Sequence, residues 1–314
     1  MRVLHCPVNT AGIPWANSLA LRRLGIESDL VVFNRYKLHP EADRSLDLPQ
    51  GSQLRRQPRQ WRAFLELLPR YDVFHFYSAV TLVPASLQFR ILHALGKRGI
   101  YHYLGRDIRG KSRDQLAYGL RADVEIVGSY DAIRWVPHAD VVLPGIEVSR
   151  IEPAIPDAGT RRPVILHAPS SRRRKGTEHV VAACEGLDAE LRIVEGLTHD
   201  EAFEQYRQAD IVVDQLNAGW YGVFAIECLA LGKPVVTFLH DEAVRRTEAA
   251  YGVEVPLVAT TKETLRETLA PLVADGARRR AIGEASRAYA ERLHDVDRIA
   301  EQLVGIYERV LDKK

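Results

Sequence analysis

Short apolar runs alternate with segments of helical periodicity along most of the chain. The runs Arg2–Cys6, Asp72–Phe76 and Val164–His167 are rich in branched and aromatic side chains, which is typical of strands buried on both faces of a parallel sheet. After the first run, Pro14 suits the first position of a helix that continues to Leu24. The alternation predicts doubly wound α/β sheets.

The remaining elements follow from the same pattern. Further strands are expected at Asp29–Phe33, Gly99–Tyr103, Val124–Val127, Asp140–Leu143, Leu191–Val194 and Asp210–Asp214. The polar, aperiodic segment Asn34–Pro58 predicts a long surface loop before the next helix. Thr198-x-x-Glu201 and Thr260-x-x-Glu263 predict capping boxes at the starts of two helices.

A break in the pattern divides the chain. Residues 151–162 contain two prolines and a glycine and have little periodicity, which is typical of a linker between domains. A length of 314 residues also suits two cores. We therefore expect a first domain over residues 1–150 and a second over residues 151–295. Apolar residues at spacings of four, three and four from Ile299 to Val310 predict an amphipathic terminal helix, residues 296–314, that packs back on the first domain.

Composition narrows the class of partner. With 46% hydrophobic residues, 27% charged residues and a net charge of +2, the chain is that of a globular protein without the basic excess of a nucleic-acid binder. A small-molecule or glycan partner is expected instead. Cys6, Cys184 and Cys228 lie far apart in apolar patterns and predict buried free thiols in a reducing compartment, the cytoplasm. No segment approaches the roughly 18 apolar residues of a membrane-spanning helix, which leaves room for peripheral contact with a membrane.

Two stretches of the second half suggest a binding site. In Ala209–Phe238, Glu227 interrupts an otherwise apolar helix, so its carboxylate requires a partner or a polar cleft. The basic run Arg172-Arg173-Arg174-Lys175 follows a strand and precedes a helix, where cations and free backbone amides suit a diphosphate. A solvated basic turn or a nonspecific nucleic-acid patch is the alternative for this run. Because ligands of doubly wound sheets bind at the carboxyl ends of the strands, both stretches belong to one expected crevice.

These residues also resemble a known family. Lys175-Gly176-Thr177 after His167-Ala168-Pro169, together with the segment from Tyr221 to Val236, looks like the donor-binding half of the GT-B glycosyltransferases, in particular the large retaining, family 4-like group that uses nucleotide sugars. The segments Asp72–Phe76, Gly105–Arg109 and Pro144–Glu147 are similar to its acceptor domain and to the stretch before its linker. The resemblance spans most of the chain. It implies two Rossmann-like domains facing a central cleft, the first for the acceptor and the second for the nucleotide sugar.

The resemblance implies roles for single residues of the donor site. Glu227 matches a glutamate that holds the ribose hydroxyls, and carboxylate oxygens can accept both hydrogen bonds. Lys175 matches the lysine that neutralises the diphosphate. Ser170 stands where an arginine usually accompanies it, so Arg172 or Arg174 would substitute.

Backbone groups and two departures complete the implied site. The amides around Tyr221, Gly222 and Val223 would meet the sugar or phosphate, and Gly12 would approach from the first domain.

Gly219 replaces the glutamate that binds the donor sugar in the family, and Asp214 or Gln215 are the residues expected to bind the sugar in its place. The position before Gly105, often histidine in the family, is Leu104; Asp107 and His75 are the candidates to line the reaction centre. The alternative for His75, which ends an apolar strand, is a satisfied core histidine.

Other patterns argue against metal and nicotinamide chemistry. The chain has neither CxxC nor HExxH, and Asp295-x-Asp297 lies where acidic residues are expected at the start of the terminal helix. No GxGxxG follows the first strand. We therefore expect neither a metal nor another cofactor. Trp220 and Tyr221 either stack on a base or sugar or form part of the cleft wall.

The expected activity is transfer of a sugar from a nucleotide diphosphate to the hydroxyl of a glycan, a lipid-linked or a small-molecule acceptor. The resemblance implies retention at the anomeric carbon. Two alternatives stay open: a nucleotide-sugar epimerase on the same fold, and a noncatalytic nucleotide- or glycan-binding module. A basic and aromatic surface around Arg35, Tyr36, Arg55, Arg56 and Trp61 could meet a lipid phosphate or an anionic glycan, or be a solvated loop.

Overall fold

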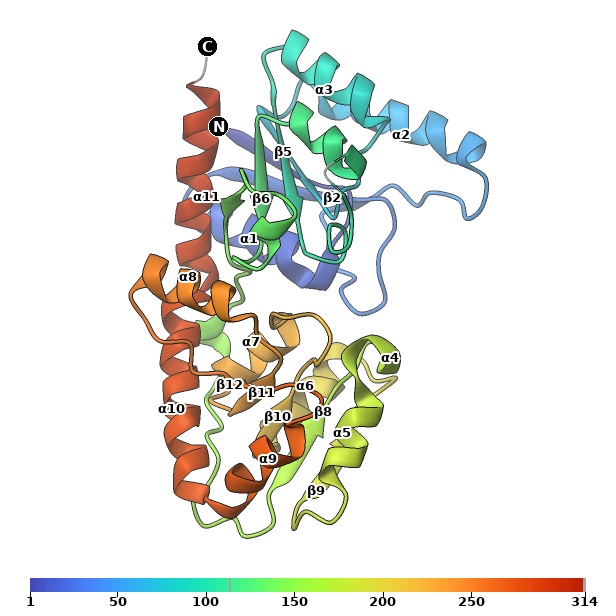
Figure 1. The fold of residues 1–314 in the computed structure, drawn as a ribbon. Helices are drawn as coiled ribbons and strands as arrows, with labels where there is room; N and C mark the ends of the chain where they lie inside the picture. The colour runs from blue at the N-terminus through green and yellow to red at the C-terminus, as the bar shows by residue number, and fades with distance from the viewer. Residues whose placement is uncertain (113, 313–314) are drawn as a thin grey trace. The chain divides into compact units, whose positions relative to one another are not determined.

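Two parallel sheets form the framework of the protein, and the α/β fold predicted from the sequence is confirmed (Figure 1). The computed structural model describes residues 1–112 and 114–312. Contacts divide the chain into two compact units. The first contains residues 1–145 and the segment that begins at Val296, and the second is Ile146–Asp295.

The first unit contains the seven-stranded sheet, in the order β3-β2-β1-β4-β5-β6-β7. Its strands are β1 (Arg2–Cys6), β2 (Glu27–Val32), β3 (Arg44–Ser45), β4 (Val73–Tyr77), β5 (Arg98–Tyr103), β6 (Val124–Val127) and β7 (Asp140–Val141). Its α-helices are α1 (Ile13–Arg23), α2 (Gln53–Leu67), α3 (Ala85–Ala94) and α11 (Val296–Leu311). Short 3₁₀ helices lie at Thr10–Gly12, Asp114–Arg121 and Ala132–Arg134. Helix α11, expected from its apolar spacing, packs against α1 within this unit.

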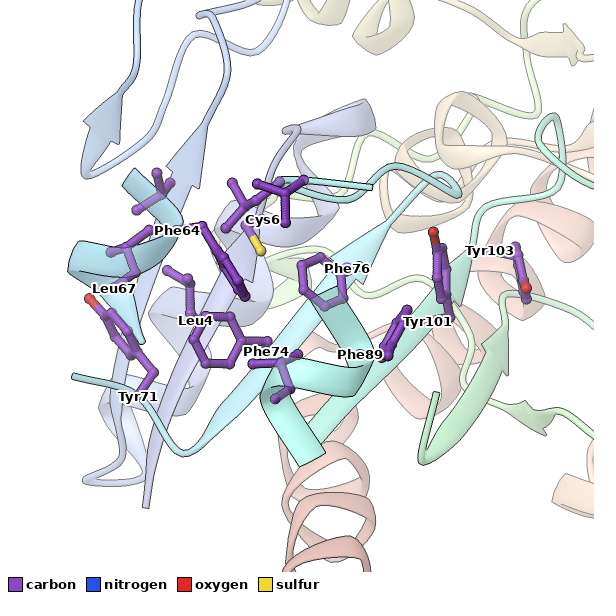
Figure 2. Close-up of a cluster of buried hydrophobic side chains, with 14 of the residues drawn as sticks. Leu4, Cys6, Phe64, Leu67, Tyr71, Phe74, Phe76, Phe89, Tyr101 and Tyr103 are labelled. Carbon is purple, nitrogen blue, oxygen red and sulfur yellow. The ribbon is translucent and has the colours of Figure 1, made fainter. Parts of the chain in front are cut away.

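One face of this sheet is an apolar core of aromatic side chains (Figure 2). Phe74 and Phe76 of β4 and Tyr101 of β5 are fully or almost fully buried. Helices α2 and α3 cover them with Phe64 and Phe89, whose rings pack edge-on against Phe74 and Phe76 at 6.3 and 5.7 Å between centroids. Since side chains of a strand alternate between faces, the residues between these aromatics point the other way.

The opposite face is a buried layer of polar side chains. Its members come from β1, β4, β5, α1 and α11, and they are His5, Asn17, His75, Tyr77, His102 and Tyr307. His75 Nδ1 lies 2.7 Å from the Tyr307 hydroxyl, and His75 Nε2 lies 3.1 Å from His102 Nδ1. Burial lowers the pKa of His5 and His102 to about 3 and lowers that of His75 well below its ordinary value. The three imidazoles are therefore neutral at neutral pH.

The second unit contains the five-stranded sheet, in the order β12-β11-β10-β8-β9. Its strands are β8 (Val164–His167), β9 (Glu190–Ile193), β10 (Ile211–Val213), β11 (Val235–Thr237) and β12 (Val258–Ala259). Its helices are α4 (Arg172–Lys175), α5 (Thr177–Cys184), α6 (His199–Arg207), α7 (Val223–Ala230), α8 (Asp241–Tyr251), α9 (Leu265–Ala274) and α10 (Gly276–Leu293), with a 3₁₀ turn at Val148–Arg150. Helices α5 and α9 pack together over one apolar cluster, and α7 packs on α10.

The segment predicted as a linker lies against the second unit, held by cationic side chains that donate to its carbonyls. The buried Arg279 donates to Thr160 O at 2.6 Å, and Arg287 donates to Ile151 O at 2.7 Å. The ammonium of buried Lys233 donates to Ala154 O. These bonds satisfy carbonyls that no regular element pairs.

Two local predictions were wrong, for identifiable reasons. Helix α2 begins inside the predicted loop, where the Ser52 hydroxyl accepts from the amide of Leu54 at 3.3 Å. Pro58 lies inside this helix and lacks the N–H that would have bonded the carbonyl of Leu54, in the first turns of the helix, where residue Leu54 as a whole is 81% exposed. The box expected at Thr260 does not form, because α9 begins at Leu265 and the Thr260 hydroxyl donates to Thr261 O.

The other capping box is confirmed. The Glu201 carboxylate accepts from the amide of Thr198 at 2.8 Å, and the Thr198 hydroxyl accepts from the amide of Glu201 at 3.4 Å. Among the described residues, the helices all fall short of the length and apolarity that crossing a lipid bilayer requires.

Candidate active site

A buried ion pair forms where β8 and β10, neighbours in the second sheet, end. Lys175 closes α4 after β8, and its Nζ lies 2.7 Å from Oδ1 of Asp214, the residue after β10. The Asp214 side chain is fully buried and that of Lys175 is 16% exposed. The other carboxylate oxygen accepts from the amide of Gly222 at 3.0 Å. Asp214 is expected from the sequence to hold a donor sugar. In the structure its carboxylate bonds both the Lys175 ammonium and the Gly222 amide at the start of α7.

Helix α7 presents an open N-terminus beside this ion pair. Gly222 is its N-cap residue, and no side chain of the described chain caps it. A Cβ built on Gly222 would lie 3.9 Å from the Lys175 ammonium, an ordinary van der Waals contact that places the start of α7 beside this cation. Uncapped amides and a cation together favour an anion at this point. The sequence-predicted residues Lys175, Gly222 and Val223 are therefore brought together.

The basic run before Lys175 is not uniform. Arg172 is paired with Glu178 and Glu195, each at 2.9 Å, so its charge is already balanced. Arg174 is exposed and its guanidinium has no ion pair in the described chain, while the Asn217 amide holds its carbonyl at 3.2 Å. Ser170 is exposed in the preceding loop. Of the two arginines expected to assist Lys175, only Arg174 keeps an unbalanced charge.

Glu227 has the partner that its apolar helix requires. His199 Nε2 lies 2.7 Å from Glu227 Oε1, and the Glu227 side chain is 12% exposed. The hydrogen bond to Glu227 raises the pKa of His199. His199 was not among the residues expected from the sequence. The capping box at Thr198 was the available signal, since it places His199 at the first position of α6.

Gly219 excludes a larger side chain at its position. Its φ is 66°, in the left-handed region, and a Cβ built there would overlap the ring of His240. A glutamate at residue 219 is thus incompatible with the present place of His240. Gln215, one of the two residues expected to replace that glutamate, donates its side-chain amide to Trp220 O instead.

We predict that Gly219→Ala lowers the free energy of unfolding for two reasons. The left-handed conformation costs an alanine about 1–2 kcal/mol, and the added methyl group also meets His240, so the total loss should exceed that amount. Urea denaturation measures the effect. Gly196→Ala is the matched control, since Gly196 has a φ of 77° and nothing within 4 Å of its built Cβ. Adding His240→Ala is expected to recover the difference between the two variants. Equal losses for Gly219→Ala and Gly196→Ala would show that His240 is not the obstacle.

Trp220 and Tyr221 belong to the interior of the second unit. Trp220 is 2% exposed and Tyr221 is 5% exposed, and their rings stack at 4.7 Å between centroids. The Tyr221 hydroxyl lies 2.9 Å from that of Tyr289 and 3.0 Å from His294 Nε2. The sequence left two alternatives for these rings, stacking on a base or sugar and forming part of the cleft wall. Their burial favours the second alternative. The Tyr221 side chain is thus fully engaged within the second unit.

The candidates in the first unit are dispersed. His75 is fully buried in the polar layer, with a partner at each ring nitrogen, and this geometry favours a core histidine. Asp107 closes the turn after β5 by accepting from the amide of Leu104 at 3.1 Å, and burial raises its pKa. Gly12 begins α1 with a φ of 71°, and its built Cβ would lie 3.2 Å from His39 Nδ1. No hydrogen bond joins Asp107 to His75 within the described residues.

The arrangement of potential metal ligands gives no support for a metal centre in the described part of the chain. Within residues 1–112 and 114–312, no group of three or more histidine, cysteine or acidic side chains is placed to hold a metal ion. Asp297, in the first turn of the terminal helix α11, pairs with Arg23 at 2.5 Å.

Known structures match the chain over its whole length. A sucrose-phosphate synthase from Thermosynechococcus elongatus aligns with a TM-score of 0.71 at 17% identity, over 99% of both chains. HepE from Anabaena, in complex with UDP and glucose, aligns at 0.68 and 14% identity, over 98% of this chain and 100% of its own. A Listeria monocytogenes protein described as a UDP-N-acetylglucosamine 2-epimerase aligns at 0.59 and 15%, over 100% of this chain and 97% of its own.

Comparisons of the amino-acid sequence do not assign the chain to a family. No family model matches the chain, and no curated protein matches it. The narrower assignment to a family 4-like group therefore stays a prediction. The agreement in structure shows that the chain has the GT-B fold.

Proposed function

We propose that the protein is a glycosyltransferase that moves a sugar from a nucleotide diphosphate to an acceptor hydroxyl. The observation that supports this most is the meeting of the Lys175 ammonium, the buried Asp214 and the uncapped start of α7. A cation and free amides suit a diphosphate. HepE, which has the same fold, is known in complex with UDP and glucose.

The Glu227 carboxylate lies far enough from the proposed diphosphate site to contact the nucleoside part of the same ligand. Glu227 follows Gly222 by five residues on α7, which is about 7.5 Å along the axis at about 1.5 Å per residue. Asp214 and Glu227 both act electrostatically on Tyr206 and Cys228, whose pKa values burial raises, so the two carboxylates lie in one neighbourhood. We assign the diphosphate to Lys175 and the helix start, and the ribose hydroxyls to Glu227.

The proposed reaction breaks the bond between the anomeric carbon and the diphosphate and forms a bond to the acceptor oxygen, whose proton is lost. Negative charge grows on the leaving diphosphate, and Lys175, Arg174 and the amides of α7 would offset it. Retention at the anomeric carbon and independence of metal are part of the proposal. On the acceptor side, Asp107 is the preferred candidate over His75, because His75 is fully buried whereas Asp107 is only partly buried.

The acceptor and the place of action also remain proposals. The outer face of α2 exposes Arg55, Arg59 and Arg62, together with Leu54 and Leu65, which are 81% and 58% exposed. Arginines flanked by apolar side chains suit an anionic membrane surface, which favours a lipid-linked acceptor. The free cysteines, two of them buried, fit the cytoplasm.

A panel of nucleotide sugars, offered with and without acceptors, tests the proposal. Release of free nucleotide together with a glycosylated product supports transfer. Release of an isomerised nucleotide sugar without acceptor would indicate an epimerase, the activity in the description of the Listeria protein. Tight binding without turnover for any pair would indicate a binding module. NMR of the product gives the anomeric configuration, and a chelator tests metal independence.

A further inference from the structure

The pair of His199 and Glu227 is not explained by binding of a diphosphate. Glu227 lies on α7, whose other inward positions are apolar, and an ionised carboxylate there costs free energy unless a partner compensates. The 2.7 Å contact to His199 supplies that partner. Because an ionised carboxylate only accepts hydrogen bonds, His199 must carry its proton on Nε2.

The direction of the His199 ring is determined by the structure around it. His199 is the first residue of α6 and directly follows Thr198. The amide and the hydroxyl of Thr198 each donate a hydrogen bond to Glu201 Oε2 at 2.8 Å, which fixes the start of the helix. One turn later, the ring of Phe203 lies 6.0 Å from that of His199. Helix α6 is joined to α7 by Tyr206 and Phe224, whose rings meet at 4.8 Å.

The contact with His199 uses only one side of the carboxylate. Glu227 Oε1 accepts from His199, and Oε2 has no hydrogen-bond partner within the described residues. The side chain is 12% exposed, and within the described residues Oε2 is not among the fully buried polar atoms that lack a partner, so this second oxygen can be reached from outside. A carboxylate offers about four acceptor positions, enough for a histidine and for two neighbouring hydroxyl groups.

We propose that His199 is a positioning residue that orients the Glu227 carboxylate toward the vicinal diol of a nucleotide's ribose. The inference rests on the proposed function, since it requires that a nucleotide binds beside α7. His199 then acts on affinity only through Glu227 and only for ligands that possess the diol. The raised pKa of His199 agrees with a close, directed hydrogen bond.

The test compares ribonucleoside diphosphates with their 2′,3′-dideoxy forms by calorimetry, using UDP, ADP and GDP. The native protein is expected to bind the diol form of its preferred nucleotide at least about tenfold more tightly, since charge-assisted hydrogen bonds are lost with the diol. In His199→Leu and in His199→Asn, which is too short to reach Glu227, this ratio is expected to fall below about threefold. Affinity for the dideoxy form should change less than about twofold.

Conservative and matched variants separate positioning from folding. His199→Gln keeps an N–H that can reach the carboxylate, so it should retain more of the ratio than His199→Asn. His179→Leu is the control, because His179 is an exposed histidine of α5 in the same unit. Leu, Asn and Gln variants together keep the test valid if one of them fails to fold.

The outcomes distinguish this inference from the function on which it rests. If no nucleotide binds the native protein, the proposed function fails. If nucleotides bind and the native ratio is high, but His199→Asn keeps that ratio while folded, His199 has no positioning role and the proposed function survives. A native protein that binds both forms equally would also overturn the inference, because Glu227 would not be at the diol.

Discussion

Replacing Lys175 by alanine is expected to lower the turnover number for sugar transfer by about 10²- to 10³-fold, with a smaller loss of nucleotide affinity. The reason is that charge on the diphosphate grows as the bond to the sugar breaks, and the Lys175 ammonium stands beside the open start of α7 where that charge would lie. The turnover number and KM from initial rates of nucleotide release measure the effect separately.

Two controls sharpen the experiment on Lys175. Arg173→Ala removes an exposed charge from the same short helix and should leave turnover within about twofold, as expected for a screened surface charge. Lys175→Arg keeps the charge and should retain more activity than alanine. Turnover equal to that of the native protein in a folded Lys175→Ala variant would remove the lysine from the phosphate site.

The largest loss of stability is expected when one member of the ion pair between Lys175 and Asp214 is removed. Lys175→Met leaves a fully buried carboxylate whose remaining bond is to the amide of Gly222, and the free energy of unfolding should fall by about 3–5 kcal/mol. Asp214→Leu should cost less, because the Lys175 side chain is 16% exposed and its ammonium can reach water. Urea denaturation of both variants measures the two losses.

The double variant Lys175→Met/Asp214→Leu decides whether the charges are coupled. It removes both charges and should be more stable than Lys175→Met alone, with a coupling energy of about 0.5–3 kcal/mol. Trp220 is the tryptophan of the second unit, so its fluorescence in a background of Trp15→Phe, Trp61→Phe and Trp135→Phe reports on that unit. Additive losses would mean that the two side chains do not stabilise each other.

The sequence predicts those parts of the site that follow from topology. Asp214 directly follows β10, Gly222 precedes α7, and Lys175 closes the short helix between β8 and α5, and parallel strands bring such connecting segments to one edge of the sheet. Their gathering could therefore be expected before the structure was known. The strands could be expected too, since apolar runs such as those of β8 and β10 have the composition of buried strands.

The sequence does not predict which side chains meet across elements. His199 and Glu227 are 28 residues apart, and their contact depends on how α6 packs on α7. The overlap between a Cβ at residue 219 and the ring of His240 likewise depends on how two loops pack, one after β10 and one after the neighbouring strand β11. Local preferences also misled: Pro58 looked like the end of a loop, yet helix α2 continues through it near a solvent-exposed start.

The buried polar layer of the first unit makes that half of the protein sensitive to acid. His5, His75 and His102 have pKa values lowered by burial, so the unfolded chain, with histidines near 6.5, binds more protons than the folded one as the pH falls. Stability is therefore lost between about pH 6.5 and 3 as the unfolded chain takes up these protons. An acidic buffer should thus destabilise the first unit, because the unfolded chain binds protons that the buried histidines of the folded sheet do not, so purification and storage of the protein call for neutral solutions.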